Sequence, residues 1–539
     1  MHVNGSSSSS CSWVDYASST LPSSDSVTNS ALYLLALLAV VSFFAAPIRN
    51  RLRSVEIYPV VNTTKEEYLK GAKALLARGA EEYGGKPFRV YTGQGTLTVL
   101  APEFVHDVKN DDRLSSTEFL LAYWQAGTPG FEPYVSSGSE LIREMIRTRL
   151  TPGEVDVECF FASQPSYRSP LQEKQPMLSE TSSPTMKLTN YLFFFFFEEW
   201  HEITLASTIP RIAARVSALV FLGPELCRDP IWLDITINYP IKAMAAAKVL
   251  RSYPSPVRRL VHWFLPCCRE LRRMLRTARL AIEPIQRRRR EQGAGASGAA
   301  PDNALAWIER LSSKRKDGTA QTAAFQQLGL SILANASTTD LVSQNILDLC
   351  RSPGLVEPLR DEVLRETRGG WKTSSLYRLK LLDSVLKETL RLKPIASVAL
   401  GRRVMEDGVR LSDGSLLPRT TGVAVSSAKM WDPKVYPGPE TFDGHRFLRM
   451  RESGTNEHVA QLASVSPEHL GFGIGSHVCP GRFLGSNSAK LIMSYILLQY
   501  DFKLADDEDG AAVDPVHFGF SMLANPRAKV YIRRRKGVA

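Results

Sequence analysis

The chain has 539 residues, of which 44% are hydrophobic, so it is long enough to fold around a sizeable buried core. Its net charge of +11 would suit a nucleic-acid-binding protein, but it lacks zinc-ligand spacings, RNA-binding signatures and any alternation of basic and aromatic residues. We therefore expect no nucleic-acid partner and interpret the charge as a docking or membrane-proximal surface. The seven cysteines show no pairing pattern, which is typical of reduced thiols in a cytosol-facing domain.

The N-terminal residues divide into a tail, an apolar segment and a linker. Residues 1–30 are Ser-rich and contain no Lys or Arg, whereas residues 31–48 are apolar and uncharged, close to the minimum length for crossing a bilayer. Three arginines follow at once in the linker, 49–60, so the positive-inside rule predicts a lumenal tail and a cytosolic remainder. A cleaved signal peptide, the alternative, would carry its positive charges before the apolar segment. The pattern predicts a single-pass anchor in the endoplasmic reticulum membrane and a folded domain over 61–539.

The next residues predict mixed helix and strand. Thr64 is placed to cap a helix that runs to Ala80. Residues 89–91 and 96–100 are predicted to be paired strands across a Gly-containing turn. Further helices are predicted over 136–150, over 200–285 and, as one long apolar helix, over 321–349.

Residues 152–197 differ in composition from both of their flanks. The segment is polar, rich in Pro and Ser and aperiodic, and it ends in five consecutive phenylalanines at 193–197. Loops of this length are uncommon inside compact domains. Phenylalanine codons are pure pyrimidine, so the phenylalanine run is what a polypyrimidine tract before a splice acceptor would encode. We interpret 152–197 as a translated retained intron, with a genuine disordered insertion as the alternative.

Residues 471–482 form a glycine-rich loop that presents one cysteine, Cys479, just before a helix predicted over 482–500. Gly475 and Gly481 lack the β-carbon that would hold the backbone away from a flat ligand. The N-terminus of the following helix favours the thiolate form of Cys479. A thiolate of this kind can be the axial ligand of a haem iron, which favours O–O cleavage. The alternative is a glycine-rich turn around a buried structural cysteine.

The spacing F-x-x-G-x-H-x-C-x-G in this loop resembles the cytochrome P-450 family of haem-thiolate monooxygenases. The resemblance implies that Cys479 is the proximal iron ligand of haem b and that Phe472 packs beside it. It also implies that Gly475 makes room for the porphyrin and that Gly481 completes the motif. His477 stands where most members have a propionate-binding arginine.

A second motif, E-x-x-R at Glu388 and Arg391, puts two charges one turn apart on a helix face. The spacing recurs elsewhere in the chain, but only this copy is followed by strands, by Arg446 and by the cysteine loop. The resemblance implies that Arg446 joins Glu388 and Arg391 in a buried structural network. It further implies that Arg403, the second of two adjacent arginines, reaches a haem propionate.

The predicted helix over 321–349 matches the family's distal helix. Members typically carry an acid (or His) followed by a threonine there, which relay protons during oxygen activation. With Asp340 fixing the register, Ala336 stands at the acid position and Ser337 at the threonine position. Ser337 or the neighbouring Thr338 can still hold a water, but the carboxyl is missing.

The resemblance implies a mainly α domain with a small β subdomain, the P-450 fold, beside the N-terminal transmembrane helix. Residues 395–400 and 518–522 sit where the family lines its substrate pocket, and both are largely apolar. Residues 382–451 and 467–535 resemble filamentous-fungal members that oxidise terpenoids. The expected function is therefore oxidation of a small apolar terpenoid in secondary metabolism, with O2 and electrons from a membrane-bound NADPH-cytochrome reductase.

Two other classes remain open at this stage. One is a haem-thiolate isomerase, dehydratase or peroxygenase that needs no reductase, which the missing acid at Ala336 keeps in consideration. The other is an inactive, misspliced product that cannot fold around 152–197.

Overall fold

The computed structural model describes residues 58–92, 95–150, 198–292, 303–314, 323–454, 456–505 and 513–536. The predicted tail, the anchor at 31–48, most of the linker and the segment 152–197 lie outside the described residues. The remainder of the chain, from Tyr58 onward, forms one compact unit.

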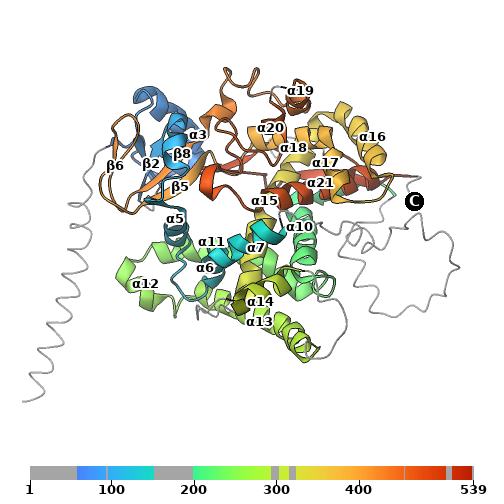
Figure 1. The fold of residues 1–539 in the computed structure, drawn as a ribbon, viewed down its shortest axis with the longest axis horizontal. Coiled ribbons are helices and arrows are strands. Elements are labelled where there is room, and N and C mark those ends of the chain that lie inside the picture. The colour runs from blue at the N-terminus through green and yellow to red at the C-terminus, as the bar shows by residue number, and fades with distance from the viewer. Residues whose placement is uncertain are drawn as a thin grey trace, which may run out of the picture. The chain divides into compact units, whose positions relative to one another are not determined.

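Helices dominate the described residues, which confirms the predicted fold class (Figure 1). Their bounds are α3 (Lys65–Glu82), α4 (Val105–Val108), α5 (Ser116–Trp124), α6 (Glu132–Ser137), α7 (Glu140–Met145), α10 (Leu205–Leu222), α11 (Pro230–Arg251), α12 (Ser255–Val261), α13 (Pro266–Gln292), α14 (Ala304–Lys314), α15 (Ala323–Arg351), α16 (Val356–Thr367), α17 (Thr373–Arg378), α18 (Lys380–Leu392), α19 (Arg446–Glu452), α20 (Glu457–Ala460) and α21 (Arg482–Gln499). A π-helix, Ile146–Leu150, follows α7.

The strands form one larger sheet and several small ones. The five-stranded sheet has the order β1 (Phe88–Tyr91), β2 (Thr96–Leu100), β8 (Gly422–Ser426), β5 (Val398–Val404) and β3 (Leu114–Ser115). A three-stranded sheet has the order β4 (His201–Thr204), β12 (Lys529–Arg534) and β9 (Tyr500–Leu504). Two hairpins pair β6 (Val409–Arg410) with β7 (Leu416–Leu417), and β10 (Val516–Phe518) with β11 (Ser521–Leu523).

Local sequence signals located the first elements correctly. The Thr64 hydroxyl accepts a hydrogen bond from the Glu67 amide and so caps α3, because the first N–H groups of a helix have no partner within it. The predicted hairpin is also present, with Val90 opposite Leu97 in an antiparallel pair.

Two predicted helical segments are interrupted. Within 136–150, α6 ends at Ser137 and α7 begins at Glu140. The Ser139 hydroxyl caps α7 by accepting a hydrogen bond from the Ile142 amide. Residues 200–285 are predicted to be helices with an apolar turn at 261–266, but they open with strand β4. That strand pairs with β12, more than 300 residues further along the chain, so no local pattern could have identified it.

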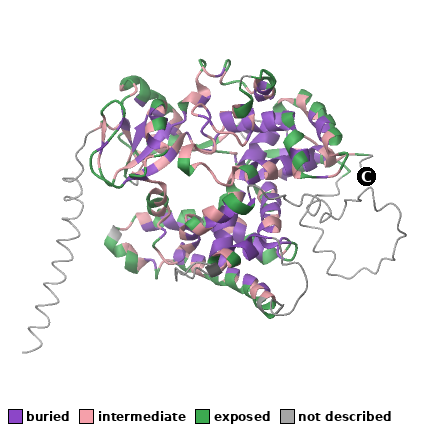
Figure 2. Ribbon diagram, in the orientation of Figure 1, coloured by how far each residue is buried: buried purple, intermediate pink, exposed green. Residues whose placement is uncertain are grey.

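The long helix α15 is the centre of the fold and is buried over most of its length. It packs against α10, α13, α18 and α21, and Figure 2 shows that the inward faces of the helices are buried while the outward faces are exposed. Among the described residues, only α10 is both long and apolar enough to cross a membrane, but more than half of it is buried in the protein core. Helix α15 therefore supplies one fixed wall for the site described next.

Candidate active site

The loop that carries Cys479 is closed by its own backbone hydrogen bonds. The Cys479 amide donates to the Phe472 carbonyl at 2.9 Å, and the Val478 amide donates to the Gly475 carbonyl at 3.0 Å. Helix α21 then begins at Arg482, whose guanidinium donates to the Cys479 carbonyl at 3.1 Å. The loop is thus a rigid turn that fixes the sulfur just before a helix N-terminus.

The electrostatic environment of Cys479 combines opposing effects. Burial raises the pKa of the Cys479 thiol, whereas a hydrogen bond from the Gly481 amide and the charge of Arg482 act to lower that pKa. The helix N-terminus therefore lowers the pKa of Cys479 as predicted, but burial raises that pKa by more. A buried thiolate needs a positive partner to be stable, and a metal ion bound directly to the sulfur provides one.

A cavity of about 310 Å³ lies against this loop. Its walls come from α5, the π-helix, α15, β5 and the cysteine loop, and they include Phe119, Ile146, Leu333, Leu400, Ile474 and Val478. Leu333 is 51% exposed although α15 is otherwise mostly buried, because its side chain borders this space. An apolar slot between α15 and a cysteine loop suits a flat, largely apolar ligand.

Cationic groups line the same cavity. The Arg402 side chain is only 3% exposed and donates to the Gly401 carbonyl, while its Nε and Nη2 atoms have no hydrogen-bond partner among the described residues. The buried Nε of Arg143 is similarly unpaired within that part of the chain. Arg147 is the third of these cations, and the His477 imidazole lies in the same wall. Buried unpaired guanidinium nitrogens are costly, so these side chains fit a ligand that carries carboxylates, such as the propionates of haem.

His477 is held in place by the Ser116 hydroxyl, which lies 3.0 Å from its Nδ1. Burial lowers the pKa of His477, and the charges of Arg402 and Arg143 lower it further. The imidazole is therefore neutral near pH 7, and it can act as a hydrogen-bond donor through its one N–H.

The assignment of Arg403 to a haem propionate stays a prediction, although its neighbour Arg402 is the one that lines the cavity. Successive residues of a strand point to opposite faces, and in β5 it is Arg402 that is buried and lines the cavity. The adjacent arginines could not be told apart from sequence, because the packing of β5 decides which face of the strand is buried, and its pairing with β8 shifts in register between Ala399 and Arg402. Arg143 and Arg147 were also missed, since their only signal is a spacing of four residues on a helix that directly precedes 152–197.

The glycines of the loop have different protein surroundings, and their expected contacts with haem stay predictions. A β-carbon at Gly475 would lie 2.4 Å from the Lys109 carbonyl oxygen, and its φ of +83° is unfavourable for other residues, so packing against the 109–110 turn requires glycine there. Gly473, with φ +67°, lines the cavity instead. A β-carbon at Gly481 would meet no atom within 4 Å.

On α15 the two hydroxyl residues of the distal motif face different environments. Thr338 is buried, whereas Ala336 is exposed and Ser337 is partly exposed, one turn beyond Leu333. The Ser337 hydroxyl donates to the Leu333 carbonyl at 3.3 Å. Ser337 is therefore nearer to the cavity face of the helix than Thr338 is.

Glu388, Arg391 and Arg446 form one ion-pair cluster. Arg391 donates to both carboxylate oxygens of Glu388, at 2.8 and 2.9 Å, and Arg446 Nε donates to Glu388 Oε1 at 3.0 Å. The remaining guanidinium nitrogens donate to backbone carbonyls, including those of Met430 and Pro437. The cluster ties α18 to the segment that leads into α19.

The two segments expected to line a substrate pocket lie side by side. The Ser397 amide donates to the Phe520 carbonyl at 2.8 Å, and the Met522 amide donates to the Ile395 carbonyl at 3.0 Å. The β10–β11 turn also rests on α3, since a β-carbon at Gly519 would lie 2.3 Å from the Tyr68 ring.

The fold is mainly helical, and a cysteine loop faces its central helix across a cavity lined by cations that suit propionates. These features are typical of haem-thiolate proteins. The sequence profile of the Cytochrome P-450 family matches residues 241–530, and the chain belongs to this family, whose members are haem-dependent monooxygenases. Bound haem would supply an iron whose thiolate ligand favours oxygen activation, with Cys479 as that ligand and Arg402, Arg143 and His477 near its propionates.

Curated relatives agree over most of the chain. The cytochrome P-450 monooxygenase hepE of Aspergillus oryzae is 38% identical over 481 residues, which are 88% of this chain and 83% of the relative. Cytochrome P-450 monooxygenase 1 of Gibberella fujikuroi is 39% identical over 464 residues, covering 84% of this chain and 98% of the relative. The solved structure of retinoic-acid-bound cyanobacterial CYP120A1 matches the fold with a TM-score of 0.60, at 16% identity over 89% of this chain and 99% of that one.

Proposed function

We propose that the protein is a membrane-anchored monooxygenase that oxidises a small apolar terpenoid of fungal secondary metabolism. Its cofactor is haem b with Cys479 as the iron ligand, and it uses O2 and electrons from an NADPH-cytochrome reductase. The single observation that supports this most strongly is the apolar cavity between Leu333 of α15 and the cysteine loop. Its wall includes guanidinium nitrogens of Arg402 and Arg143 that have no hydrogen-bond partner among the described residues. An apolar slot selects substrates by burial rather than by charge.

The test is co-expression of the full chain with a reductase, a panel of cyclised terpenes, and mass spectrometry of the products. A product that gains oxygen only when the reductase and NADPH are present supports the proposal. The Cys479→His variant should lose both the product and the red-shifted Soret band of the reduced carbon monoxide complex. If that spectrum is unchanged in the variant, Cys479 is not the ligand.

A reductase-independent enzyme is the second candidate, and Ala336 favours it because no carboxyl stands on the exposed face of α15 at that position. Turnover with hydrogen peroxide, or isomerisation without any oxidant, would identify this candidate in the same experiment. Absence of haem binding in the full chain would instead indicate a misspliced, inactive product.

The membrane anchor and the segment 152–197 belong to the same proposal. Deleting residues 1–48 should release the chain from microsomal membranes while it still binds haem, because the anchor precedes the folded domain. Transcript sequencing should reveal a spliced form without 152–197, and deletion of that segment should raise the yield of haem-loaded protein. A soluble full-length protein, or a deletion that unfolds the domain, would contradict these two assignments.

A further inference from the structure

The turn that carries His477 is fastened to residues 109–116, which lie more than 360 residues earlier in the chain. The Ser476 amide donates to the side-chain oxygen of Asn110 at 2.8 Å, and the Ser476 hydroxyl donates to the Lys109 carbonyl at 3.1 Å. These two hydrogen bonds hold the backbone of the turn but leave the direction of the imidazole undetermined. A further contact is therefore needed to fix that side chain.

Ser116 supplies this contact, since its hydroxyl oxygen lies 3.0 Å from His477 Nδ1. Both side chains lie in the wall of the cavity at the cysteine loop. Nε2 is then the remaining nitrogen of the imidazole, and it has no hydrogen-bond partner among the described residues. A hydrogen bond at one ring nitrogen decides which nitrogen carries the proton of a neutral imidazole. When the hydroxyl donates to Nδ1, the N–H is on Nε2 and is available to a ligand in the cavity.

The Ser116 hydroxyl is not required for the local fold. Ser115, not Ser116, caps α5, because its hydroxyl accepts a hydrogen bond from the Glu118 amide at 3.1 Å. Ser115 also pairs with Arg403 between β3 and β5, which places the start of α5 beside β5. Within the described part of the chain, the contact with His477 is the only hydrogen bond of the Ser116 side chain. The hydroxyl therefore acts on the imidazole rather than on the backbone.

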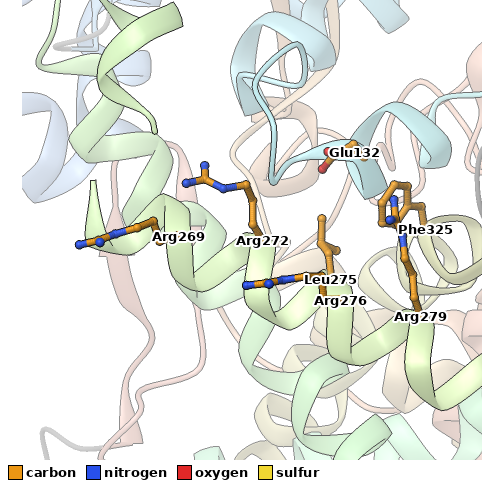
Figure 3. Close-up of a pocket in the computed structure, with 7 residues that line it drawn as sticks. All are labelled: Glu132, Arg269, Arg272, Leu275, Arg276, Arg279 and Phe325. Atoms are coloured by element: carbon orange, nitrogen blue, oxygen red, sulfur yellow. The ribbon is translucent and has the colours of Figure 1, made fainter. Parts of the chain in front are cut away.

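A second cavity, of about 440 Å³, provides a contrast, since it shares no lining residue with the cavity at the cysteine loop. Four arginines of α13 line it, and Figure 3 shows their side chains along one helix face: Arg269, Arg272, Arg276 and Arg279. None of them has a carboxylate partner within the described part of the chain, but three of the four are exposed, so water solvates their charge. Arg402 in the cysteine-loop cavity is only 3% exposed, so its unpaired nitrogens are costly unless a ligand accepts hydrogen bonds from them. The buried cation therefore marks the wall that contains Ser116 and His477 as the place where an anionic group binds.

We propose that Ser116 is a positioning residue, which orients the imidazole of His477 so that Nε2 donates its proton in a hydrogen bond to a carboxylate of bound haem. This inference rests on the proposed binding of haem at Cys479. Arg402 supplies positive charge from β5, whereas His477 supplies one directed N–H from the loop that holds the iron ligand. Without the Ser116 hydroxyl, the proton can move to Nδ1 or the ring can turn, and the directed donor is lost.

The experiment uses the full-length, haem-loaded chain and measures the rate of haem loss to an apoglobin acceptor and the reduction potential of the haem. Ser116→Ala should accelerate haem loss by roughly tenfold, as expected when a charge-assisted hydrogen bond is lost. It should also lower the reduction potential, because a carboxylate without its donor keeps more negative charge near the iron and so favours the ferric state. Ser116→Thr should keep both values close to those of the wild type, since threonine retains the hydroxyl.

Two comparisons separate positioning from a structural role. Ser476→Ala removes a hydroxyl that lies in the same turn but donates to a backbone carbonyl. It should leave the reduction potential unchanged and alter the rate of haem loss by less than about twofold. In a His477→Leu background, Ser116→Ala should add no further change to either value, because the hydroxyl then has no imidazole to act on.

Unchanged haem loss and an unchanged reduction potential in Ser116→Ala would overturn the proposal. So would equal effects of Ser116→Ala in the wild-type and His477→Leu backgrounds, because the hydroxyl would then act directly on the haem or on the fold. Failure of the proposed function would look different. The wild-type chain would then lack the red-shifted Soret band of the reduced carbon monoxide complex, which would refute haem-thiolate binding and this inference together.

Discussion

Glu388 and Arg391 are joined by two hydrogen bonds, and neither side chain exposes any surface to solvent. Glu388 is also the carboxylate partner of Arg446, so a single acidic side chain pairs with two guanidinium groups at the junction of α18 and α19. Because both cations are buried, this carboxylate contributes more to the stability of the fold than any single exposed ion pair does.

The first prediction follows from that arrangement. Glu388→Ala should lower the free energy of unfolding by roughly 3–5 kcal/mol, because it leaves two buried guanidinium groups without a carboxylate. Urea unfolding measures the change, or the yield of haem-loaded protein if the variant does not fold. Arg273→Ala breaks an exposed pair with the same E-x-x-R spacing and should cost less than about 1 kcal/mol. Similar losses in the two variants would contradict the argument.

The second prediction separates the adjacent arginines of β5. Arg402→Ala should lower the haem content of the purified protein strongly, because the buried Arg402 lines the cavity and has unpaired nitrogens. Arg403→Ala should have a small effect, since Arg403 lies on the other face of the strand. Haem stoichiometry and the rate of haem loss to an apoglobin acceptor measure both. A larger loss of haem in Arg403→Ala than in Arg402→Ala would support Arg403 as the propionate-binding residue, as predicted from the sequence.

The third prediction concerns the hydroxyls of α15. Ser337→Ala should leave haem spectra and substrate binding nearly intact but divert NADPH consumption from product to hydrogen peroxide, since proton delivery by a positioned group is typically worth about 10²–10⁴-fold. Thr338→Ala should uncouple less, because Thr338 is buried. The ratio of product to NADPH measures the coupling. Unchanged coupling in both single variants and in the double variant would show that protons come from elsewhere.

The fourth prediction is a pH dependence centred on Asp340. Burial raises the pKa of Asp340 to about 6, although its carboxylate accepts hydrogen bonds from the Ala524 amide and the Gln344 side chain. The folded protein then binds this proton more tightly than the unfolded chain, so the contribution of Asp340 to stability falls as pH rises from about 4 to about 6.

Asp340→Asn removes this dependence. The wild-type free energy of unfolding should fall by roughly 2 kcal/mol relative to the variant across that interval, because the slope is at most about 1.36 kcal/mol per pH unit and is smaller near each pKa. Urea unfolding of both proteins from about pH 4 to about pH 7 measures the difference in slope, which is independent of any constant offset caused by the substitution. Parallel curves would show that the pKa of Asp340 is not raised.

Local chemistry explains which parts of the site could be predicted. Thr64 caps α3 through its own hydroxyl, and Glu388 meets Arg391 one turn away, so both contacts lie within a few residues of sequence. The cysteine loop was recognisable because its motif spans only ten residues. The prediction failed at β4, because that strand depends on its distant partner β12. The packing of Gly475 against the Lys109 carbonyl also had no local signal in the sequence.

The sequence by itself determined the family, the mainly helical fold and the cysteine that is the candidate iron ligand, because spacing along the chain encodes those features directly. Only the tertiary structure decided that Arg402 rather than Arg403 lines the cavity, and that Arg143 and Arg147 share that wall. It also showed that one face of α13 carries arginines without carboxylate partners among the described residues. The physical reason is that burial and charge pairing depend on which segments pack together in the folded chain. That packing is determined by long-range contacts and by strand irregularities.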